Sequence, residues 1–169
     1  MKQRTLVLIK PDAVQRGLIG EVITRFERVG LKIVGAKMVH PSYEHYHHHY
    51  EGISKMISRR GQKAFDITLA LMQKGPVLAL VLEGVEVVPV VRKMIGSTEP
   101  KEALPGTIRG DYAHISYAYA DTVDAPIANI VHASGNDEEA EAEIKHWFSE
   151  EELFNYQTVA EQFTQTGKD

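Results

Sequence analysis

Uninterrupted apolar runs alternate along this chain with segments whose apolar residues recur at helical spacing. Residues 5–9 and 76–82 are continuous apolar runs, which is typical of strands buried on both faces of a sheet. Residues 31–39 also favour a strand, and Gly35 inside it indicates a β-bulge. Residues 114–119 alternate between apolar and polar side chains, so we predict the fourth strand there.

Four other segments carry the period of an amphipathic helix. They cover residues 19–29, 62–74, 87–95 and 137–147, and Gly30, Gly75 and Gly96 stand where the first three end. Residues 87–95 are rich in valine, which by propensity favours a strand. Their apolar spacing and the proline in the first turn favour a helix instead.

The order of these elements predicts the fold class. A strand, helix, strand, helices, strand, helix and strand in succession indicate an α+β protein with a ferredoxin-like βαββαβ arrangement, a four-stranded antiparallel sheet covered by helices. With 169 residues, the chain is expected to form a single domain, residues 1–169. The loop at residues 96–111 is long for a compact domain, which is typical of functional loops.

Composition narrows the functional classes. The chain has no cysteine, so disulfides, thiolate metal sites and thiol catalysis are excluded. We expect a cytoplasmic protein without a membrane partner, because no apolar run is long enough to span a bilayer and the N-terminus lacks a signal-peptide pattern. The net charge of −4 argues against a stable nucleic-acid partner. Any phosphate site must therefore come from a local cluster of cations.

The strongest candidate for chemistry is His132, in the stretch Asn129-Ile130-Val131-His132-Ala133-Ser134. A neutral imidazole is a competent nucleophile near pH 7, provided that a hydrogen bond at its second nitrogen fixes the tautomer. A carboxylate on the following helix can supply that bond, and Glu139, Glu141 and Glu143 are all candidates. Ser134 either orients a neighbouring group or caps the turn.

Several cations and polar residues stand at element ends where a phosphate site can form. Lys10 ends the first strand before a proline, Arg92 lies in the last turn of a predicted helix, and Thr98 and Arg109 lie in the long loop. Phosphoryl transfer depends mainly on positioning and on charge neutralisation by such groups and magnesium. The chain has no glycine-rich phosphate loop, so side chains must hold the phosphates. The histidines between residues 45 and 49 favour a solvated helix, with metal binding the minority interpretation.

These motifs resemble the nucleoside diphosphate kinase family. The stretches that carry the resemblance are Leu8-Ile9-Lys10-Pro11-Asp12, Pro105-Gly106-Thr107-Ile108-Arg109-Gly110-Asp111 and the His132 stretch, together with Arg92, Thr98 and Pro100. The resemblance implies ping-pong transfer of a γ-phosphoryl group from a nucleoside triphosphate to a nucleoside diphosphate, with Mg²⁺ on the nucleotide phosphates. It also implies a homo-oligomer: a dimer, tetramer or hexamer.

The resemblance assigns roles to individual residues. It implies that His132 is the phosphorylated nucleophile, that Glu143 holds it and that Ser134 is a hydrogen-bonded neighbour. Lys10 lies near the sugar and the transferring phosphate, so it counts as both catalytic and nucleotide-binding. The other implied nucleotide contacts are Tyr50, Arg92, Thr98, Arg109 and Asn129.

Two segments depart from the family pattern. The segment between Tyr50 and Gly75 is longer than usual, with the extra length at about residues 52–63. Ala64 or Phe65 falls where the base-stacking phenylalanine belongs. The segment at residues 112–128 is also longer than usual. We expect Phe65, Thr68 and Pro126 to form the wall of the base pocket.

Two other functional classes stay open, the first of them because of the altered base wall and the two longer segments. One is a binding or regulatory protein on the same scaffold, which would hold nucleotide with negligible turnover. The other is a nucleic-acid-binding module with a ferredoxin-like sheet, a class that presents aromatic and basic residues on the sheet. The predicted strands are almost wholly aliphatic, which argues against the second class.

Overall fold

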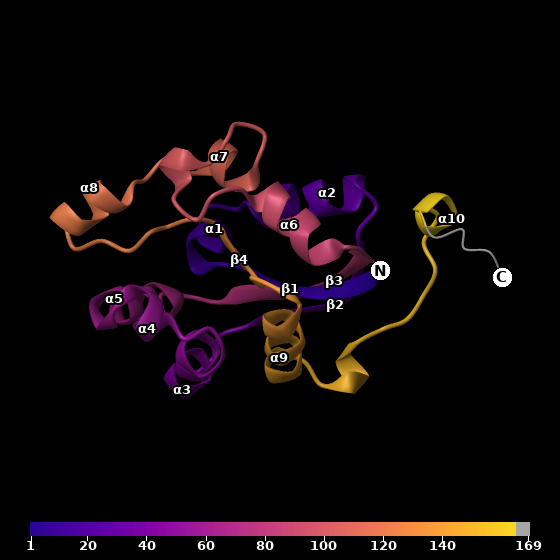
Figure 1. Ribbon diagram of the computed structural model, residues 1–169, viewed down its shortest axis with the longest axis horizontal. Coiled ribbons are helices and arrows are strands. Elements are labelled where there is room, and N and C mark those ends of the chain that lie inside the picture. The colour runs from indigo at the N-terminus through magenta and orange to yellow at the C-terminus, as the bar shows by residue number, and fades with distance from the viewer. Residues whose placement is uncertain (165–169) are drawn as a thin grey trace.

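A computed structural model describes residues 1–164 and shows an antiparallel four-stranded sheet with helices on both faces (Figure 1). The strands are β1 (Lys2–Ile9), β2 (Lys32–Val39), β3 (Val77–Val85) and β4 (Val131–Ala133), in the spatial order β2-β3-β1-β4. The first three strands and the bulge between Ile33 and Gly35 confirm the sequence predictions. This is the predicted α+β, ferredoxin-like order of elements.

The two faces of the sheet bury different helices. One face packs on α1 (Pro11–Gln15), α2 (Ile19–Arg28), α6 (Val87–Ile95) and α7 (Ile108–Tyr112). The other packs on α3 (Tyr43–His47), the π-helical turn η1 (His48–Ile53), α5 (Gln62–Met72) and α9 (Asp137–Trp147), with α4 (Met56–Arg60) beside α5. β1 contributes side chains to both cores because successive side chains of a strand point to opposite faces of the sheet. The continuous apolar run of β1 therefore reflects burial on both sides.

The predicted strand at residues 114–119 is wrong. Ser116 caps a short helix there, α8 (Tyr117–Thr122), because its hydroxyl accepts a hydrogen bond from the Tyr119 backbone N–H at 3.1 Å. The alternation of tyrosine and alanine is too weakly apolar to hold this segment on the sheet. The fourth strand is instead β4, which contains His132 and pairs with β1.

The helix predictions are confirmed, and small elements fill the remaining loops. The valine-rich segment forms α6, as its spacing predicts. The long loop contains the 3-10 turn η2 (Pro100–Glu102) and α7. After α9 come η3 (Glu150–Glu152) and α10 (Glu161–Thr164). Residues 165–169 of the predicted domain lie outside the described residues. Within residues 1–164, no helix has the length and apolarity that a membrane span requires.

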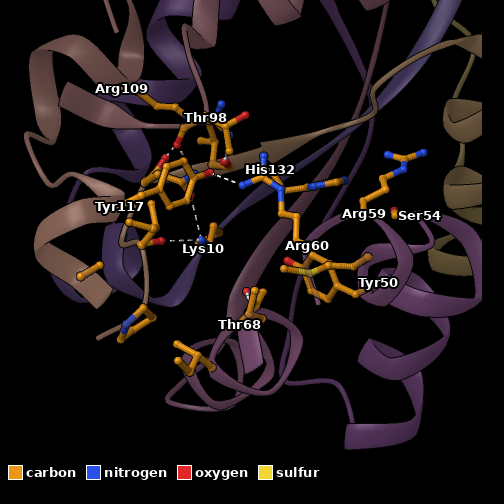
Figure 2. Close-up of a pocket in the computed structure, with 18 of the residues that line it drawn as sticks. Lys10, Tyr50, Ser54, Arg59, Arg60, Thr68, Thr98, Arg109, Tyr117 and His132 are labelled. Atoms are coloured by element: carbon orange, nitrogen blue, oxygen red, sulfur yellow. Dashed lines mark hydrogen bonds between the residues drawn. The ribbon is translucent and has the colours of Figure 1, made fainter. Parts of the chain in front are cut away.

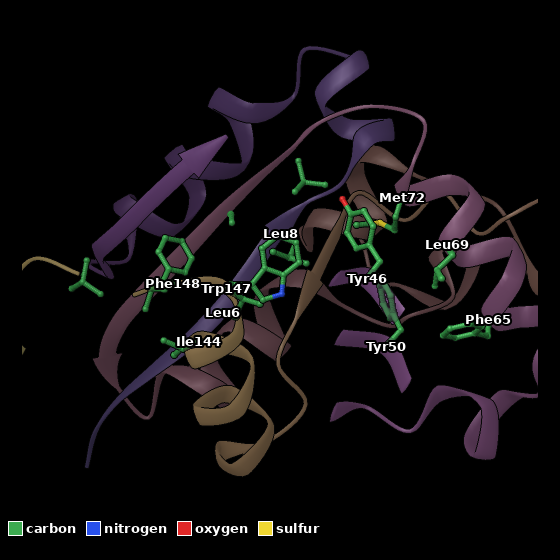
Figure 3. Packing of buried hydrophobic residues seen from close by; sticks show 14 residues of the cluster. Leu6, Leu8, Tyr46, Tyr50, Phe65, Leu69, Met72, Ile144, Trp147 and Phe148 are labelled. Atoms are coloured by element: carbon green, nitrogen blue, oxygen red, sulfur yellow. The ribbon is translucent and has the colours of Figure 1, made fainter. Parts of the chain in front are cut away.

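Phe65 is a core residue of α5, packed with Tyr46, Leu69 and Met72 under the sheet (Figure 3). Its side chain is 1% exposed. Truncation leaves a cavity in a close-packed interior, so we expect Phe65→Ala to lower the free energy of unfolding by about 3–5 kcal/mol in urea titrations. Phe163→Ala is the matched control, because Phe163 is 81% exposed and its loss is expected to change stability by less than about 0.5 kcal/mol. Equal effects of the two variants would contradict this packing.

Candidate active site

His132 is held by two residues that the fold brings beside it. It lies in β4 opposite Leu8 of β1, and Glu143 reaches it from the second turn of α9. The His132 Nε2 and Glu143 Oε1 atoms are 3.0 Å apart. The Ser134 hydroxyl donates to the other oxygen of Glu143 at 2.6 Å and accepts the Leu6 backbone N–H at 3.2 Å. His132, Glu143 and Ser134 are thus brought together as the sequence predicts.

The Glu143 carboxylate fixes the tautomer of the His132 ring. Glu143 is fully buried, and although burial opposes ionisation, the charge and hydrogen bonds of His132 hold the pKa of this carboxyl down at about 2. An ionised carboxylate can only accept, so Nε2 must carry a proton and donate it. In the neutral ring the Nδ1 lone pair is then free for chemistry. The competing acids are engaged elsewhere: Glu139 pairs with Arg59 at 2.5 Å, and Glu141 pairs with Lys145 at 2.6 Å.

A second histidine, His49, lies against this pair. Its ring centroid is 4.6 Å from that of His132, and its Nδ1 accepts the Trp147 indole N–H at 3.1 Å. Burial lowers its pKa well below the usual value, so it stays neutral with the proton on Nε2. That Nε2 lies 3.8 Å from Glu143 Oε1, beyond hydrogen-bond distance. The sequence showed His49 only as one member of a histidine run.

A strained turn precedes His132. The Val131 backbone N–H donates to the Asn129 carbonyl at 2.8 Å across Ile130, whose φ is +71°. A β-branched residue at positive φ is unfavourable and persists only where its surroundings hold it. Asp12 helps to keep Ile130 in this conformation, because its carboxylate accepts a hydrogen bond from the Ile130 N–H at 3.0 Å. The Asp12 of the Lys-Pro-Asp motif therefore helps to shape the backbone that presents His132.

The cations predicted from the sequence converge beside His132, and neutral acceptors hold them. Lys10 Nζ donates to the Asn129 side-chain oxygen at 2.8 Å. Arg92 reaches the Ala133 carbonyl at 3.4 Å, and Arg109 donates to the carbonyls of Gly96, Asn129 and Val131. No carboxylate in residues 1–164 forms an ion pair with any of the three. Their positive charge therefore remains available to an anion.

Burial makes this positive charge costly. It lowers the pKa of Lys10 to about 8, with the neighbouring Arg109 adding to the effect and Asp12 opposing it. It also lowers the pKa of Arg109 to about 10, and the charge of Arg92 contributes. A cluster of like charges held in a buried place is expected where a phosphate ligand compensates for it.

A pocket opens in front of His132 (Figure 2), and most of the predicted site residues line it. Asn129 donates its amide N–H to the Thr98 carbonyl at 2.9 Å, and the ring of Tyr50 lies 6.0 Å from that of His132. The predicted residues on its lining are Lys10, Tyr50, Thr68, Arg92, Thr98, Arg109, Pro126, Asn129 and His132. Arg59, Arg60, Asp121 and Tyr117 also line it, and nothing in their sequence pattern singled them out.

The predicted base wall needs one correction. Phe65 does not line the pocket, because its position on α5 turns the ring into the core. Ala64 and Thr68, on an adjacent face of the same helix, line it instead. The Thr68 hydroxyl donates to the Ala64 carbonyl at 2.8 Å, so its hydrogen-bonding capacity is used within the helix. Across the pocket stand Pro126 and Ile127.

The histidines predicted as a minority metal site do not gather into one. His45 stacks on His146 with ring centroids 3.8 Å apart, whereas His49 turns inward. In the described part of the chain, the group with metal-binding spacing is His49, His132 and Glu143, with ligand atoms within 4.8 Å of one another. Two imidazoles and one carboxylate do not suit Mg²⁺, which prefers oxygen ligands in octahedral geometry.

Comparison with known proteins gives a consistent result. The family model described as nucleoside diphosphate kinase matches residues 3–153. A nucleoside diphosphate kinase from Borreliella burgdorferi is 46% identical over 156 residues, covering 91% of this chain and 92% of its own. One from Pyrococcus furiosus is 48% identical over 161 residues, covering 95% and 92%.

A solved structure described as a transition state mimic of nucleoside-diphosphate kinase from Borrelia burgdorferi, with bound vanadate and ADP, superimposes with a TM-score of 0.94. It is 42% identical and covers 97% of each chain. The family match, the sequence identities and this superposition agree with one another. The chain belongs to the nucleoside diphosphate kinase family.

Proposed function

We propose that this chain transfers a γ-phosphoryl group from a nucleoside triphosphate to a nucleoside diphosphate through a phosphohistidine at His132. The observation that carries the proposal is the bond between His132 Nε2 and the buried Glu143, which leaves Nδ1 free beside a group of unpaired cations. The vanadate and ADP complex of the Borrelia relative supports phosphoryl transfer as the reaction.

The reaction has two balanced half-steps. The Nδ1 lone pair attacks the γ-phosphorus, an N–P bond forms, and the bond from the γ-phosphorus to its bridging oxygen breaks. The electron pair leaves with the nucleoside diphosphate, and the proton on Nε2 stays between His132 and Glu143. The reverse step on a second nucleoside diphosphate restores His132. Lys10, Arg92 and Arg109 neutralise charge on the phosphate oxygens. The Asn129 side chain accepts a hydrogen bond from Lys10 and donates one to the Thr98 carbonyl, which holds these residues together at the pocket.

The metal required is proposed to be Mg²⁺. When bound to the nucleotide, it supplies further charge neutralisation for the phosphates. Among the charged side chains that line the pocket, cations outnumber the two acids, Asp121 and Glu139, and Glu139 is already paired with Arg59. This favours a metal that enters with its nucleotide over one bound by the protein alone.

Two further properties are proposed from the sequence. Absence of cysteine fits a cytoplasmic, reducing environment. The family resemblance suggests a homo-oligomer, and sedimentation equilibrium of the purified chain would give its subunit number.

The first expected result concerns the covalent intermediate. Incubation with γ-labelled ATP and magnesium should give a label that is acid-labile and stable in alkali, and that moves to added GDP. The His132→Gln variant should take up no label because the nucleophilic nitrogen is gone. An unlabelled wild-type protein would overturn the proposed function. Retention of the label on Glu143 or Ser134 would overturn the choice of nucleophile.

The second concerns the orienting acid. Glu143→Gln keeps the volume of the side chain but presents an amide to His132 Nε2 and removes the charge, so the rate of histidine phosphorylation is expected to fall by roughly 10–100-fold. Ser134→Ala should lower the rate of histidine phosphorylation by a smaller factor, because Glu143 remains ionised. Single-turnover labelling at saturating ATP measures both. Glu141→Gln is the matched control, since Glu141 is exposed and bonds only Lys145; a comparable loss in that variant would contradict the assignment.

The third concerns pH. Because burial lowers the pKa of Lys10 to about 8, its charge is present below pH 8 and is lost as the pH rises through that value. The phosphates bind the charged form, so kcat/KM for the triphosphate should fall by about tenfold between pH 7.5 and pH 9. In Lys10→Arg the charge persists, and kcat/KM should stay flat over this range at whatever level the variant retains. A wild-type profile that is flat to pH 9 would contradict this role.

A further inference from the structure

The two segments that are longer than the family pattern, residues 52–63 and 112–128, meet over the nucleotide pocket. Arg60 at the end of α4 donates a hydrogen bond to the Tyr117 hydroxyl at the start of α8. The Arg60 guanidinium carbon also lies 5.2 Å from the centroid of the Tyr117 ring. Farther out, Lys63 pairs with Asp124 at 2.5 Å. Figure 2 shows Arg60 and Tyr117 pointing toward each other from opposite sides of the pocket, close to His132.

The position of Tyr117 is fixed by its own helix. Its backbone N–H donates to the Glu99 side chain at 2.9 Å, next to Thr98 of the phosphate site. Ser116 caps the helix through the Tyr119 N–H. The phenol hydroxyl is therefore presented at the pocket by a short, capped element rather than by a free loop. A tyrosine held in this way can orient a guanidinium at low cost in side-chain entropy.

Arg60 differs from its neighbour Arg59 in its partners. Arg59 is neutralised by Glu139 at 2.5 Å. Arg60 bonds a neutral hydroxyl and forms no ion pair with a carboxylate of residues 1–164. It lines the pocket together with Lys10, Arg92 and Arg109, and its charge contributes to the lowered pKa of Arg109. Arg60 thus adds a fourth uncompensated cation to the same pocket.

The remaining donors of Arg60 are available to a ligand. A guanidinium has five N–H donors, and Tyr117 occupies one of them. Arginine binds phosphate oxygens with two parallel hydrogen bonds when its plane is fixed. The Tyr117 hydroxyl and ring supply that constraint from the far side of the pocket.

We propose that Arg60 and Tyr117 form a clasp over the bound nucleotide, in which Arg60 binds the diphosphate and Tyr117 positions its guanidinium. The inference rests on the proposed function for the identity of the ligand. It assigns a shared task to the two longer segments. Tyr117 acts through Arg60, so Tyr117 is a positioning residue and Arg60 a phosphate-binding one.

The clasp is separate from the bonds that prepare His132. Glu143 and Ser134 bond neither Arg60 nor Tyr117. Loss of the clasp should therefore weaken nucleotide binding more than the chemical step. The expected rise in KM for the nucleoside diphosphate is roughly tenfold in Arg60→Gln and about threefold in Tyr117→Phe, with kcat changed by less than about twofold. The double variant should resemble Arg60→Gln alone.

Matched controls lie in the same part of the fold but do not line the pocket. Lys63→Gln removes an exposed cation that is already paired with Asp124, and Tyr119→Phe removes the hydroxyl of a tyrosine that is 62% exposed. Neither should change KM by more than about 1.5-fold. The test compares KM for ADP, GDP, CDP and UDP in each variant. A contact with the diphosphate predicts the same factor for all four bases.

Other outcomes overturn the proposal. An unchanged KM in both Arg60→Gln and Tyr117→Phe would show that the proposed clasp does not contribute to nucleotide binding. A larger effect for purines than for pyrimidines would make Tyr117 a stacking surface for the base instead. Fully additive losses in the double variant would show that Tyr117 does not act through Arg60.

Binding measurements keep this test independent of turnover. The dissociation constant of ADP with magnesium, measured by calorimetry in the His132→Gln background, should rise by the same factors in the clasp variants. If wild-type protein transfers no phosphoryl group but the ADP affinities still change as expected, the proposed function fails and the clasp stands. If transfer is intact and the affinities do not change, the clasp fails alone.

Discussion

The carboxylate of Glu143 lies fully buried and accepts hydrogen bonds from His132 and Ser134. A buried charge is costly unless its hydrogen bonds are complete. This constraint ties together elements that are distant in sequence, because Ser134 also accepts the Leu6 backbone N–H and so joins the charge to β1. Displacement of α9 or β4 would leave the carboxylate without partners. The stability of the sheet edge and the tautomer of His132 therefore depend on the same interaction.

A second constraint is the burial of positive charge on the opposite side of His132. The fold pairs the Glu143 carboxylate internally but gives Lys10, Arg92 and Arg109 only neutral acceptors in the described residues. Internal carboxylates there would stabilise the empty protein and compete with phosphate for the same donors. Backbone carbonyls hold the guanidinium of Arg109 in place without neutralising it. Ile130, with its strained φ, lies in the same turn. The carbonyls on either side of it, those of Asn129 and Val131, accept hydrogen bonds from Arg109, and the chain then continues into His132.

The sequence predicted those parts of the structure that depend on local pattern. Apolar runs and helical spacing predict three strands and the main helices correctly, and short motifs single out His132 and most of the residues that line its pocket. The strand expected at residues 114–119 failed because a capping serine and small side chains outweighed an alternating pattern. The prediction for Phe65 is wrong because a sequence motif does not specify which face of α5 turns toward the pocket. Neither His49 nor the choice of Glu143 over Glu139 and Glu141 could be derived from spacing, since both depend on how α9 and η1 pack against β4.

The segments predicted to depart from the family pattern line both sides of the pocket. Ala64 and Thr68 offer little surface for a nucleotide base, and the lining includes Pro126 and Ile127 across from them. A wall made of small and aliphatic groups discriminates weakly between bases, since an apolar surface rejects few of their polar edges. Affinity must then come chiefly from the phosphates and from whatever closes over them. Arg60 and Tyr117 come from the two longer segments and line the same pocket. In the proposed clasp, their contacts to the phosphates offset the affinity that the weak base wall does not supply.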